Sequence, residues 1–235
     1  MTKLSVVIPA YNEARRIEAT LDSIVLFAEQ SKYDIEVIVV INNTTDHTRE
    51  IVEQFHPHLS ITILDASLSN AHGGTKGLAV KKGVLAAQGE YILYMDADNA
   101  VQLSQIETFW PSFAEGYDVV FGSRYIQGAK THRVWYRDLL GKASNLLVQA
   151  VLLPGIKDTQ CGFKCFTNKA GKELFEQLTT NGWGFDMEVL ALARKGGYRL
   201  KEVPVSWQEM DQSAIKAKAF VTTLRELFAI RKKIR

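Results

Sequence analysis

Short apolar runs alternate along the chain with segments whose apolar residues recur at a helical spacing. The runs are rich in branched and aromatic residues, as buried strands are, and lie at 4–8, 35–41, 61–64, 91–95, 118–122 and 200–207. Helical spacing is clearest in the segments 17–28, 46–55, 78–87, 104–115 and 139–152. This order of strand, helix and strand predicts an α/β fold with a doubly wound, mostly parallel sheet whose loops gather at one edge.

The chain shows no internal repeat, low-complexity tract or clear linker, which favours one large domain for its 235 residues. We expect this domain to span 1–215 and residues 216–235 to form an amphipathic, basic C-terminal extension. The apolar face of that extension carries Phe220, Val221, Leu224, Leu227 and Phe228. Its basic end consists of Arg231, Lys232, Lys233 and Arg235.

The buried run at 91–95 ends in two carboxylates, Asp96 and Asp98, with only Ala97 between them. On an extended chain, residues two apart point to the same side, so both carboxylates can face one point beyond the strand. Ligands of open α/β sheets bind at this end of the strands. Hard oxygen ligands with open positions suit Mg²⁺ or Mn²⁺ held together with a substrate phosphate. The alternative is a plain surface turn, since Asp and Asn favour turns.

Two further segments could bind an anion. The glycine-rich segment 70–77 carries Lys76 and precedes a predicted helix, where backbone N–H groups and a lysine suit a phosphate. Its spacing matches neither a P-loop nor the Rossmann fingerprint, and a flexible loop is the alternative. Arg124 follows the predicted strand 118–122 and could reach a phosphate with two hydrogen bonds, although most arginines are solvated surface residues.

Two segments are candidates for a membrane surface. Basic and aromatic residues at 129–138, among them Arg137, precede a helix whose apolar stripe is unusually broad. A core helix or a dimer face would explain the same stripe. The basic amphipathic extension 216–235 is the second candidate, with a solvated helix end as the alternative. No apolar stretch approaches the ~18 residues that span a bilayer, and the N-terminus predicts a strand rather than a signal peptide.

Composition narrows the function classes. Hydrophobic residues make up 46% and charged residues 23% of the chain, as in ordinary soluble proteins. The formal net charge of +2 is too small to indicate nucleic-acid binding. Cys161 and Cys165 have no neighbouring His or Cys that would complete a zinc site, so we expect free thiols in a reducing compartment.

The segments 6–13, 96–98 and 122–124 together resemble the inverting family 2 glycosyltransferases, which have the nucleotide-sugar-binding glycosyltransferase A-type fold. Three segments of the second half, 158–164, 183–188 and 203–207, resemble the polyprenyl-phosphate sugar transferases. The similarity is greatest to dolichyl-phosphate β-glucosyltransferases, with dolichyl-phosphate mannose synthases next. It covers nearly the whole chain, and the run Asp158-Thr159-Gln160-Cys161-Gly162-Phe163-Lys164 is its most specific part.

The resemblance implies a role for each segment. The loop of Pro9, Ala10, Tyr11 and Glu13 and the end of the second strand, at Asn42 and Asn43, would hold the base and ribose. Asp96 and Asp98 would hold the metal on the donor diphosphate, and Arg124 and Arg137 would lie near the donor and acceptor phosphates. The helix after Arg137 and the C-terminal segment would lie on the membrane. Substrate contacts would also come from Lys76, Asp96, Gln160 and Ser213.

The sequence departs from the family pattern in three places. Asn42-Asn43-Thr44-Thr45 replaces the usual Asp-Asp-Gly-Ser, the loop Gly73–Gly77 has an extra residue, and the loop 209–213 lacks a lysine unless Lys216 replaces it. An amide oxygen can accept a hydrogen bond from the N3–H group of uracil, but it lacks the two acceptors that suit the edge of guanine. The first departure therefore favours a uridine donor.

The expected activity is metal-dependent, inverting transfer of a hexose, with glucose favoured, from a UDP-sugar to a polyprenyl or dolichyl phosphate. A lipid phosphate is already ionised and needs little help from a base, whereas a hydroxyl acceptor needs a carboxylate, for which Asp158 and Asp186 are the candidates. Asp158 lies in the most specific motif and is favoured, either for orienting the acceptor or as the base, whereas Asp186 falls where related family 2 enzymes place their base. The alternatives are a soluble or glycan hydroxyl acceptor, a GDP-mannose donor, and a non-catalytic scaffold that binds nucleotide sugars. We expect a cytoplasmic protein, peripheral on the cytoplasmic face of a membrane, with no nucleic-acid partner.

Overall fold

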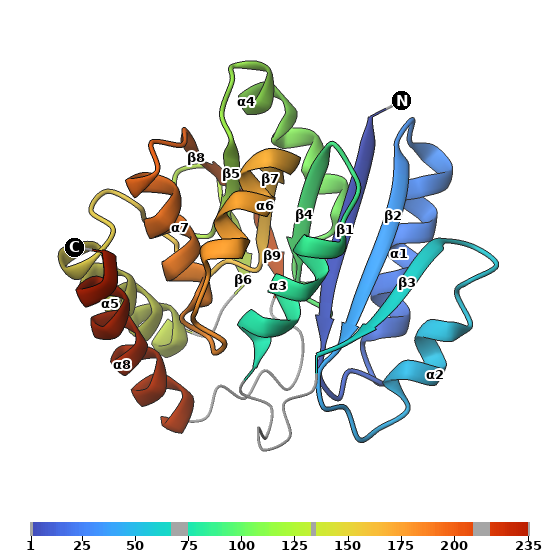
Figure 1. Cartoon of the computed structure of the whole chain (residues 1–235), viewed down its shortest axis with the longest axis horizontal. Coiled ribbons are helices and arrows are strands. Elements are labelled where there is room, and N and C mark those ends of the chain that lie inside the picture. Colours follow the sequence, from blue (N-terminus) through green and yellow to red (C-terminus); the bar gives the residue numbers. More distant parts are fainter. Residues whose placement is uncertain (1, 67–74, 133–134, 209–216, 235) are drawn as a thin grey trace.

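The computed structural model describes residues 2–66, 75–132, 135–208 and 217–234. Its main sheet has seven strands in the order β3-β2-β1-β4-β7-β5-β8 (Figure 1). In this sheet β7 runs antiparallel to its two neighbours, β4 and β5. The other strands all run in one direction; they are β1, β2, β3, β4, β5 and β8. The strands are β1 (Lys3–Ala10), β2 (Asp34–Ile41), β3 (Ser60–Asp65), β4 (Tyr91–Met95), β5 (Val119–Ser123), β7 (Phe163–Thr167) and β8 (Leu200–Pro204). This architecture confirms the expected mostly parallel, doubly wound sheet.

Helices cover both faces of the sheet because the strands are apolar on both sides. In β2, Val37 and Val39 face one hydrophobic cluster, whereas Ile38 and Val40 face the other. One face is covered by α1 (Ile17–Gln30), α2 (Thr48–Glu53), the 3₁₀ helix η1 (Leu103–Thr108) and α4 (Trp110–Ala114). The other face carries α3 (Lys76–Ala86), α5 (Trp135–Val151), α6 (Asn168–Gln177), α7 (Phe185–Lys195) and α8 (Ala217–Ile234). Continuous branched runs are typical of such doubly covered strands.

Two expected elements are each divided in the structure. The helix expected at 104–115 consists of η1 and α4, and Pro111 lies in the first turn of α4, where a missing N–H is tolerated. The strand expected at 200–207 ends at Pro204, and β9 (Ser206–Gln208) pairs instead with β6 (Lys130–His132). The Gln105 side chain bonds both backbone groups of Ser206, at 2.6 and 2.7 Å, which takes this residue away from the main sheet.

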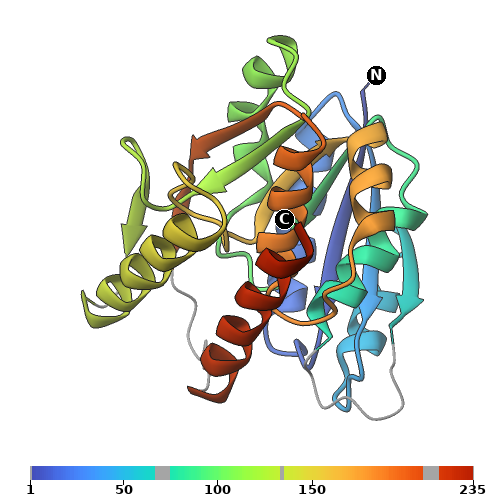
Figure 2. The same ribbon diagram turned by 60° about the vertical axis from the view of Figure 1, so that its left-hand side comes forward.

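Helix α8 packs on the domain through part of its apolar face. Leu227 and Ile230 are 1% and 2% exposed, and they belong to the same hydrophobic cluster as Val148 of α5. Helices α5 and α8 lie side by side (Figure 2). Phe228 of α8 is 56% exposed, and Leu146 of α5 is 67% exposed. Residues 217–234 are thus attached to the domain through buried contacts, and the boundary at 215/216 stays a prediction. Among the described residues, no helix combines the length and apolar character needed to cross a membrane.

Leu227→Ala should lower the free energy of unfolding by about 2–5 kcal/mol, because it removes a fully buried side chain and leaves a cavity. Phe228→Ala on the same helix is the matched control and should cost below about 1 kcal/mol, because that ring is mainly exposed. Equilibrium urea unfolding of both variants measures the difference. Equal small losses in the two variants would mean that α8 is not a cooperative part of the domain.

Candidate active site

The carboxyl ends of β1, β2 and β4 meet at one edge of the sheet, and each is followed by an asparagine with left-handed backbone. These residues are Asn12, Asn43 and Asn99, with φ values of 54°, 52° and 55°. Asparagine tolerates this conformation better than most residues, so all three strands can turn sharply where they end. Asn12 precedes the first helix, and asparagine is a favoured capping residue, but its side chain does not cap that helix. Its side-chain oxygen accepts instead from the Thr45 N–H at 2.8 Å and so joins two loops.

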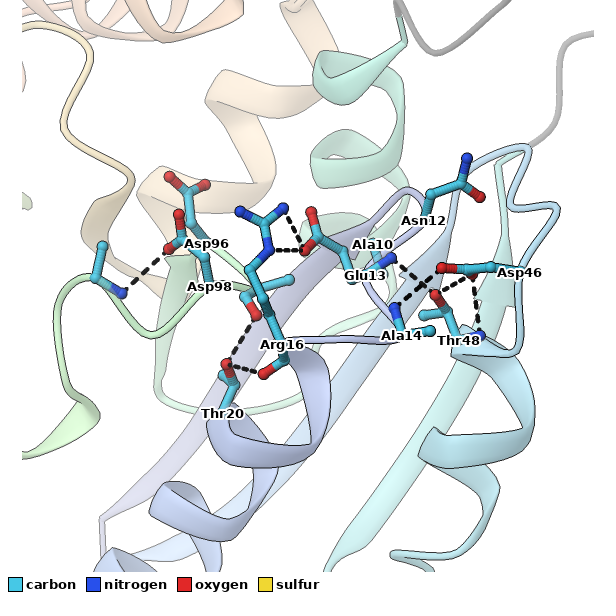
Figure 3. Close-up of polar contacts among 12 residues, drawn as sticks. Ala10, Asn12, Glu13, Ala14, Arg16, Thr20, Asp46, Thr48, Asp96 and Asp98 are labelled. Atoms are coloured by element: carbon cyan, nitrogen blue, oxygen red, sulfur yellow. Dashed lines mark hydrogen bonds and ion pairs between the residues drawn. The ribbon is translucent and has the colours of Figure 1, made fainter. Parts of the chain in front are cut away.

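The turn after β1 places Glu13 at the same edge of the sheet as Asp96 and Asp98, with the Arg16 side chain between Glu13 and the two aspartates in Figure 3. Arg16 donates to Glu13 Oε2 from Nε at 2.8 Å, and the Glu13 N–H donates to the Thr48 hydroxyl. Burial raises the pKa of Glu13 to about 7, against the opposing charge of Arg16 and with small contributions from Asp98 and Asp96. Three carboxyl groups therefore share this edge, and Arg16 offsets part of the repulsion between them when they are ionised.

The remaining residues expected to hold a nucleoside differ in how exposed they are. Pro9 and Ala10 are buried in β1, and the Ala10 carbonyl accepts from the Asn42 N–H at 2.8 Å. Tyr11 is 41% exposed. Asn42 is buried, and its side-chain oxygen accepts from the Thr75 hydroxyl. Asn43 is half-buried and is the more exposed member of the asparagine pair.

Asp96 and Asp98 follow β4 and lie beside each other in Figure 3. Lys76 Nζ lies 2.6 Å from Asp96 Oδ1, and Asp98 Oδ1 accepts from the Ala100 N–H at 3.1 Å. Burial and the charge of Asp96 raise the pKa of Asp98. A Cβ atom on Gly162 would collide with the Asp96 carboxylate, so a larger residue there would displace this side chain from its present position.

This pair of carboxylates fits a divalent cation. Their mutual repulsion is what a cation would relieve, and carboxylate oxygen is the ligand that Mg²⁺ and Mn²⁺ prefer. The described residues contain no group of three or more His, Cys, Asp or Glu that could hold a metal. Ligands from substrate phosphate and water would complete the coordination, as is common for Mg²⁺.

Arg124 and Asp158 form a bidentate ion pair. Arg124 Nε and Nη2 lie 2.6 and 2.9 Å from the two oxygens of Asp158, and the Arg124 N–H also donates to Oδ2 at 3.0 Å. The Gln160 N–H donates to Asp158 Oδ1 at 3.2 Å. Burial disfavours ionisation of Asp158, but Arg124 outweighs burial and holds the pKa of this carboxyl below its usual range. A carboxylate with these partners is poorly suited to accept a proton.

Asp186 has a different environment, in the first turn of α7. Lys164 Nζ, which is fully buried, lies 2.5 Å from Asp186 Oδ1, and the Tyr94 hydroxyl lies 3.5 Å from Oδ2. Burial raises the pKa of Asp186 although Lys164 and Lys76 oppose the shift. Lys76 in turn is attracted by both Asp96 and Asp186, which raise its pKa against the effect of burial. The two expected base candidates, Asp158 and Asp186, thus have pKa values shifted in opposite directions.

Sequence reasoning did not identify Lys164 as a site residue. The signal for it was a lysine inside the apolar segment Phe163-Lys164-Cys165-Phe166, where a charge needs a buried partner.

The structure brings Glu13, Lys76, Asp96, Asp98 and Asp186 into one cluster of interacting charges. Cys161 and Cys165 are free and buried, as expected. Ser213, the loop residues 70–74 and the side chain of Arg137 lie outside the described residues.

Comparison with known proteins gives consistent matches. Residues 5–178 match the family model described as glycosyl transferase family 2. A dolichyl-phosphate β-glucosyltransferase of Trichomonas vaginalis is 32% identical over 97% of this chain and 72% of its own length. Those of Dictyostelium discoideum and Homo sapiens are 34% and 30% identical, over 90% and 91% of this chain and 68% and 69% of their own lengths.

Among solved structures, glucosyl-3-phosphoglycerate synthase from Mycobacterium tuberculosis, in complex with Mn²⁺, UDP and glucosyl-3-phosphoglycerate, has a similar fold. The TM-score is 0.70 over 99% of this chain and 80% of that chain, with 19% sequence identity. Another complex of the same synthase, with Mg²⁺ and UDP, gives a TM-score of 0.68 at 18% identity, over 99% of this chain and 79% of that chain. At these identities the likeness shows a shared fold.

The Arg124–Asp158 pair should make folding stability sensitive to acid. The folded-state pKa of Asp158 is below its unfolded value of about 3.9, so the stabilisation is present above that pH and is lost as pH falls through the lower folded value. The double variant Arg124→Met with Asp158→Asn removes both charges and this dependence together. Urea unfolding at pH 7, 5, 4 and 3 should show a steeper loss below pH 5 in the wild type. Parallel profiles for the two proteins would contradict the assignment.

Proposed function

Because the chain belongs to glycosyl transferase family 2, we propose that it moves glucose from UDP-glucose to a polyprenyl phosphate of the dolichyl type, with inversion at the anomeric carbon. Family membership makes the chain a glycosyltransferase, and its sheet has the expected A-type fold. The choice of glucose as the sugar and of a dolichyl-type phosphate as the acceptor rests on one observation. The chain is 30–34% identical to dolichyl-phosphate β-glucosyltransferases over at least 90% of its length.

The donor side of this proposal uses the edge formed by β1, β2 and β4. Tyr11 and Glu13 follow β1 and Asn43 follows β2, so a nucleoside bound here would lie between these two loops. The amide at Asn43 favours uracil over guanine, because guanine's edge suits two carboxylate acceptors. The synthase of similar fold holds UDP, which supports a uridine donor here.

Asp96 and Asp98 would hold the divalent metal, with Mg²⁺ and Mn²⁺ as the candidates. When bound, the metal supplies positive charge against the negative charge that develops on the leaving diphosphate. Lys76 supplies a second positive charge beside Asp96, at 2.6 Å. Electrostatic stabilisation of the leaving group by fixed charges is a large part of catalysis in such sites.

The acceptor side depends on Arg124 and Asp186. Asp158 fixes the Arg124 guanidinium through two hydrogen bonds, and the Trp207 ring lies 5.8 Å from it, so Arg124 is presented in one orientation to a phosphate. Arg137 is proposed as the second phosphate contact on the strength of the resemblance. A lipid phosphate is ionised at neutral pH and attacks without a base, and Asp186 would then orient the acceptor or the sugar.

One observation favours a second candidate function. The pKa of Asp186 is raised by burial, which suits a general base for a hydroxyl acceptor, either soluble or on a glycan. Transfer from GDP-mannose and a scaffold without turnover have no such support in the site. The two leading candidates differ in the acceptor alone and share the metal, donor and leaving group.

We also propose that the protein works at a membrane surface, on the cytoplasmic side. Helices α5 and α8 pack together and leave Leu146, Leu147 and Phe228 exposed, while Arg231 and Lys232 lie near the end of α8. Exposed apolar side chains with nearby cations suit an anionic lipid surface. Residues 1–215 would then form the catalytic domain, with 216–235 contributing to membrane contact.

Calorimetric titration with UDP-glucose and with GDP-mannose, each with Mn²⁺ or with chelator, tests the donor site. We expect binding of UDP-glucose that requires metal, and Asp98→Ala should weaken it by about tenfold or more, because one ligand of the cation is lost. Asp22→Ala removes an exposed carboxylate from α1 and is the matched control, with affinity unchanged. Preference for GDP-mannose would reject the uridine donor, and absence of any binding by folded protein would favour the scaffold.

Sedimentation with vesicles that contain anionic lipid and a polyprenyl phosphate tests the membrane contact. The double variant Leu146→Glu with Phe228→Glu should reduce the bound fraction by about tenfold, because both changes place charge on the surface of α5 and α8. Leu26→Glu is the matched control, since Leu26 is 58% exposed on α1, which covers the opposite face of the sheet. Equal sedimentation of all three proteins would reject this surface.

A further inference from the structure

Helix α8 contacts the turn that begins α7. The Glu226 carboxylate accepts from the Gly184 N–H at 2.7 Å, and Gly184 is the residue immediately before α7. A Cβ atom on either Gly182 or Gly184 would collide with this carboxylate. The two glycines therefore allow a side chain from α8 to approach the backbone of this turn closely.

A second contact with the same segment comes from Lys233, about two turns further along α8 than Glu226. Lys233 Nζ lies 2.7 Å from Oε1 of Glu188, a fully buried side chain of α7. Glu188 in turn accepts from the Thr180 N–H at 2.7 Å, and its oxygens also bond the N–H and hydroxyl of Thr179. The polypeptide at 179–188 is thus tied to α8 through both Glu226 and Lys233.

The opposite side of this segment rests on α3. The Leu78 N–H donates to the Asn181 carbonyl at 3.3 Å. Gly77 is so close that a Cβ atom there would collide with the Thr180 carbonyl and with Phe185. Residues 179–185 are therefore held between the start of α3, which carries Lys76, and the inner face of α8.

This segment carries two side chains that face the cluster of charges. The Trp183 ring is 39% exposed and lies 5.0 Å from Lys76 Nζ, while Lys76 itself contacts Asp96. Asp186 follows two residues after Gly184 and is held by Lys164 at 2.5 Å. A movement of the turn would displace both Trp183 and Asp186 relative to Asp96.

We propose that Glu226 is a positioning residue of the glycosyltransferase: by binding the Gly184 N–H it fixes the turn 182–186, and thereby the places of Trp183 and Asp186 beside the donor. The inference rests on the proposed role of Asp186 and Lys76 in the site. It assigns to α8 a function in the reaction besides its contact with the domain and with lipid.

Attachment of α8 alone does not account for a carboxylate at this position. Leu227 and Ile230 already bury the helix, and an apolar side chain would fill the same space without the cost of burying a charge. Burial raises the pKa of Glu226, while its bond to Gly184 opposes the shift. A half-buried carboxylate that accepts a hydrogen bond from one backbone N–H group can hold the turn at that position.

The experiment compares Glu226→Ala and Glu226→Gln in the full chain, with Arg225→Ala, an exposed neighbour on the same helix, as the control. We expect Glu226→Ala to lower kcat about tenfold or more while the affinity for UDP with Mn²⁺ changes less than about twofold, because small displacements of reacting groups are costly and the nucleotide site is untouched. Glu226→Gln keeps an acceptor oxygen and should restore most of kcat. Arg225→Ala should match the wild type.

Hydrogen exchange measured by mass spectrometry on peptides from 179–190 gives a readout that does not depend on turnover. Glu226→Ala should accelerate exchange in this segment, and Glu226→Gln and Arg225→Ala should not. Unchanged exchange and unchanged kcat in Glu226→Ala would overturn the proposal, as would a parallel loss of UDP affinity and thermal stability, which indicates a merely structural role. If the wild type transfers no hexose, the proposed function fails, and the exchange result alone decides whether Glu226 fixes the turn.

Discussion

Two buried carboxylates, Asp158 and Asp186, set the constraint on which the site depends. Each is almost completely removed from water, and each has one cation within hydrogen-bond distance, Arg124 for Asp158 and Lys164 for Asp186. An unpaired charge at either place would cost several kcal/mol, by analogy with broken buried ion pairs in general. The loop that carries Asp158 and the first turn of α7, which carries Asp186, must therefore keep fixed positions relative to β5 and β7.

Residues 158–164 contact three parts of the candidate site. Asp158 orients Arg124 after β5, Gly162 leaves room for the Asp96 carboxylate after β4, and Lys164 neutralises Asp186 in α7. The antiparallel placement of β7 between β4 and β5 is what brings one short segment next to all of them. A site with this many interacting charges is a poor source of stability, which is typical where function decides the residues.

Helix α8 connects the turn that precedes α7 with the surface that exposes Leu146, Leu147 and Phe228. Its inner face contributes Leu227 to the core and Glu226 to the turn before α7, while Phe228 on the same helix stays exposed. One helix therefore contacts the core, the turn that carries Asp186 and the surrounding solvent. The packing of α8 on the domain and the position of Asp186 are consequently linked through Glu226.

The sequence by itself determined the elements and the location of the site. Branched runs and helical spacing are local patterns, so they identified the strands, their double covering and the carboxylates at the end of β4 without knowledge of any partner. The resemblance then indicated Asp158, Asp186 and Arg124 as site residues. The pairing of Lys164 with Asp186 could not be predicted in this way. The two residues are 22 positions apart, and no local sequence pattern indicates that they are in contact.

Only the tertiary structure separated the environments of the two candidate carboxylates, because Asp158 is paired with Arg124 and Asp186 with Lys164. Both Asp158 and Asp186 follow from the sequence as candidates, and their difference comes from burial and from the cation beside each one. The same holds for Asn12, which joins two loops rather than capping a helix, and for Gln105, which draws Ser206 out of the main sheet. Periodic patterns depend on neighbours along the chain, whereas the partner of a buried polar group depends on which distant segments the fold brings together.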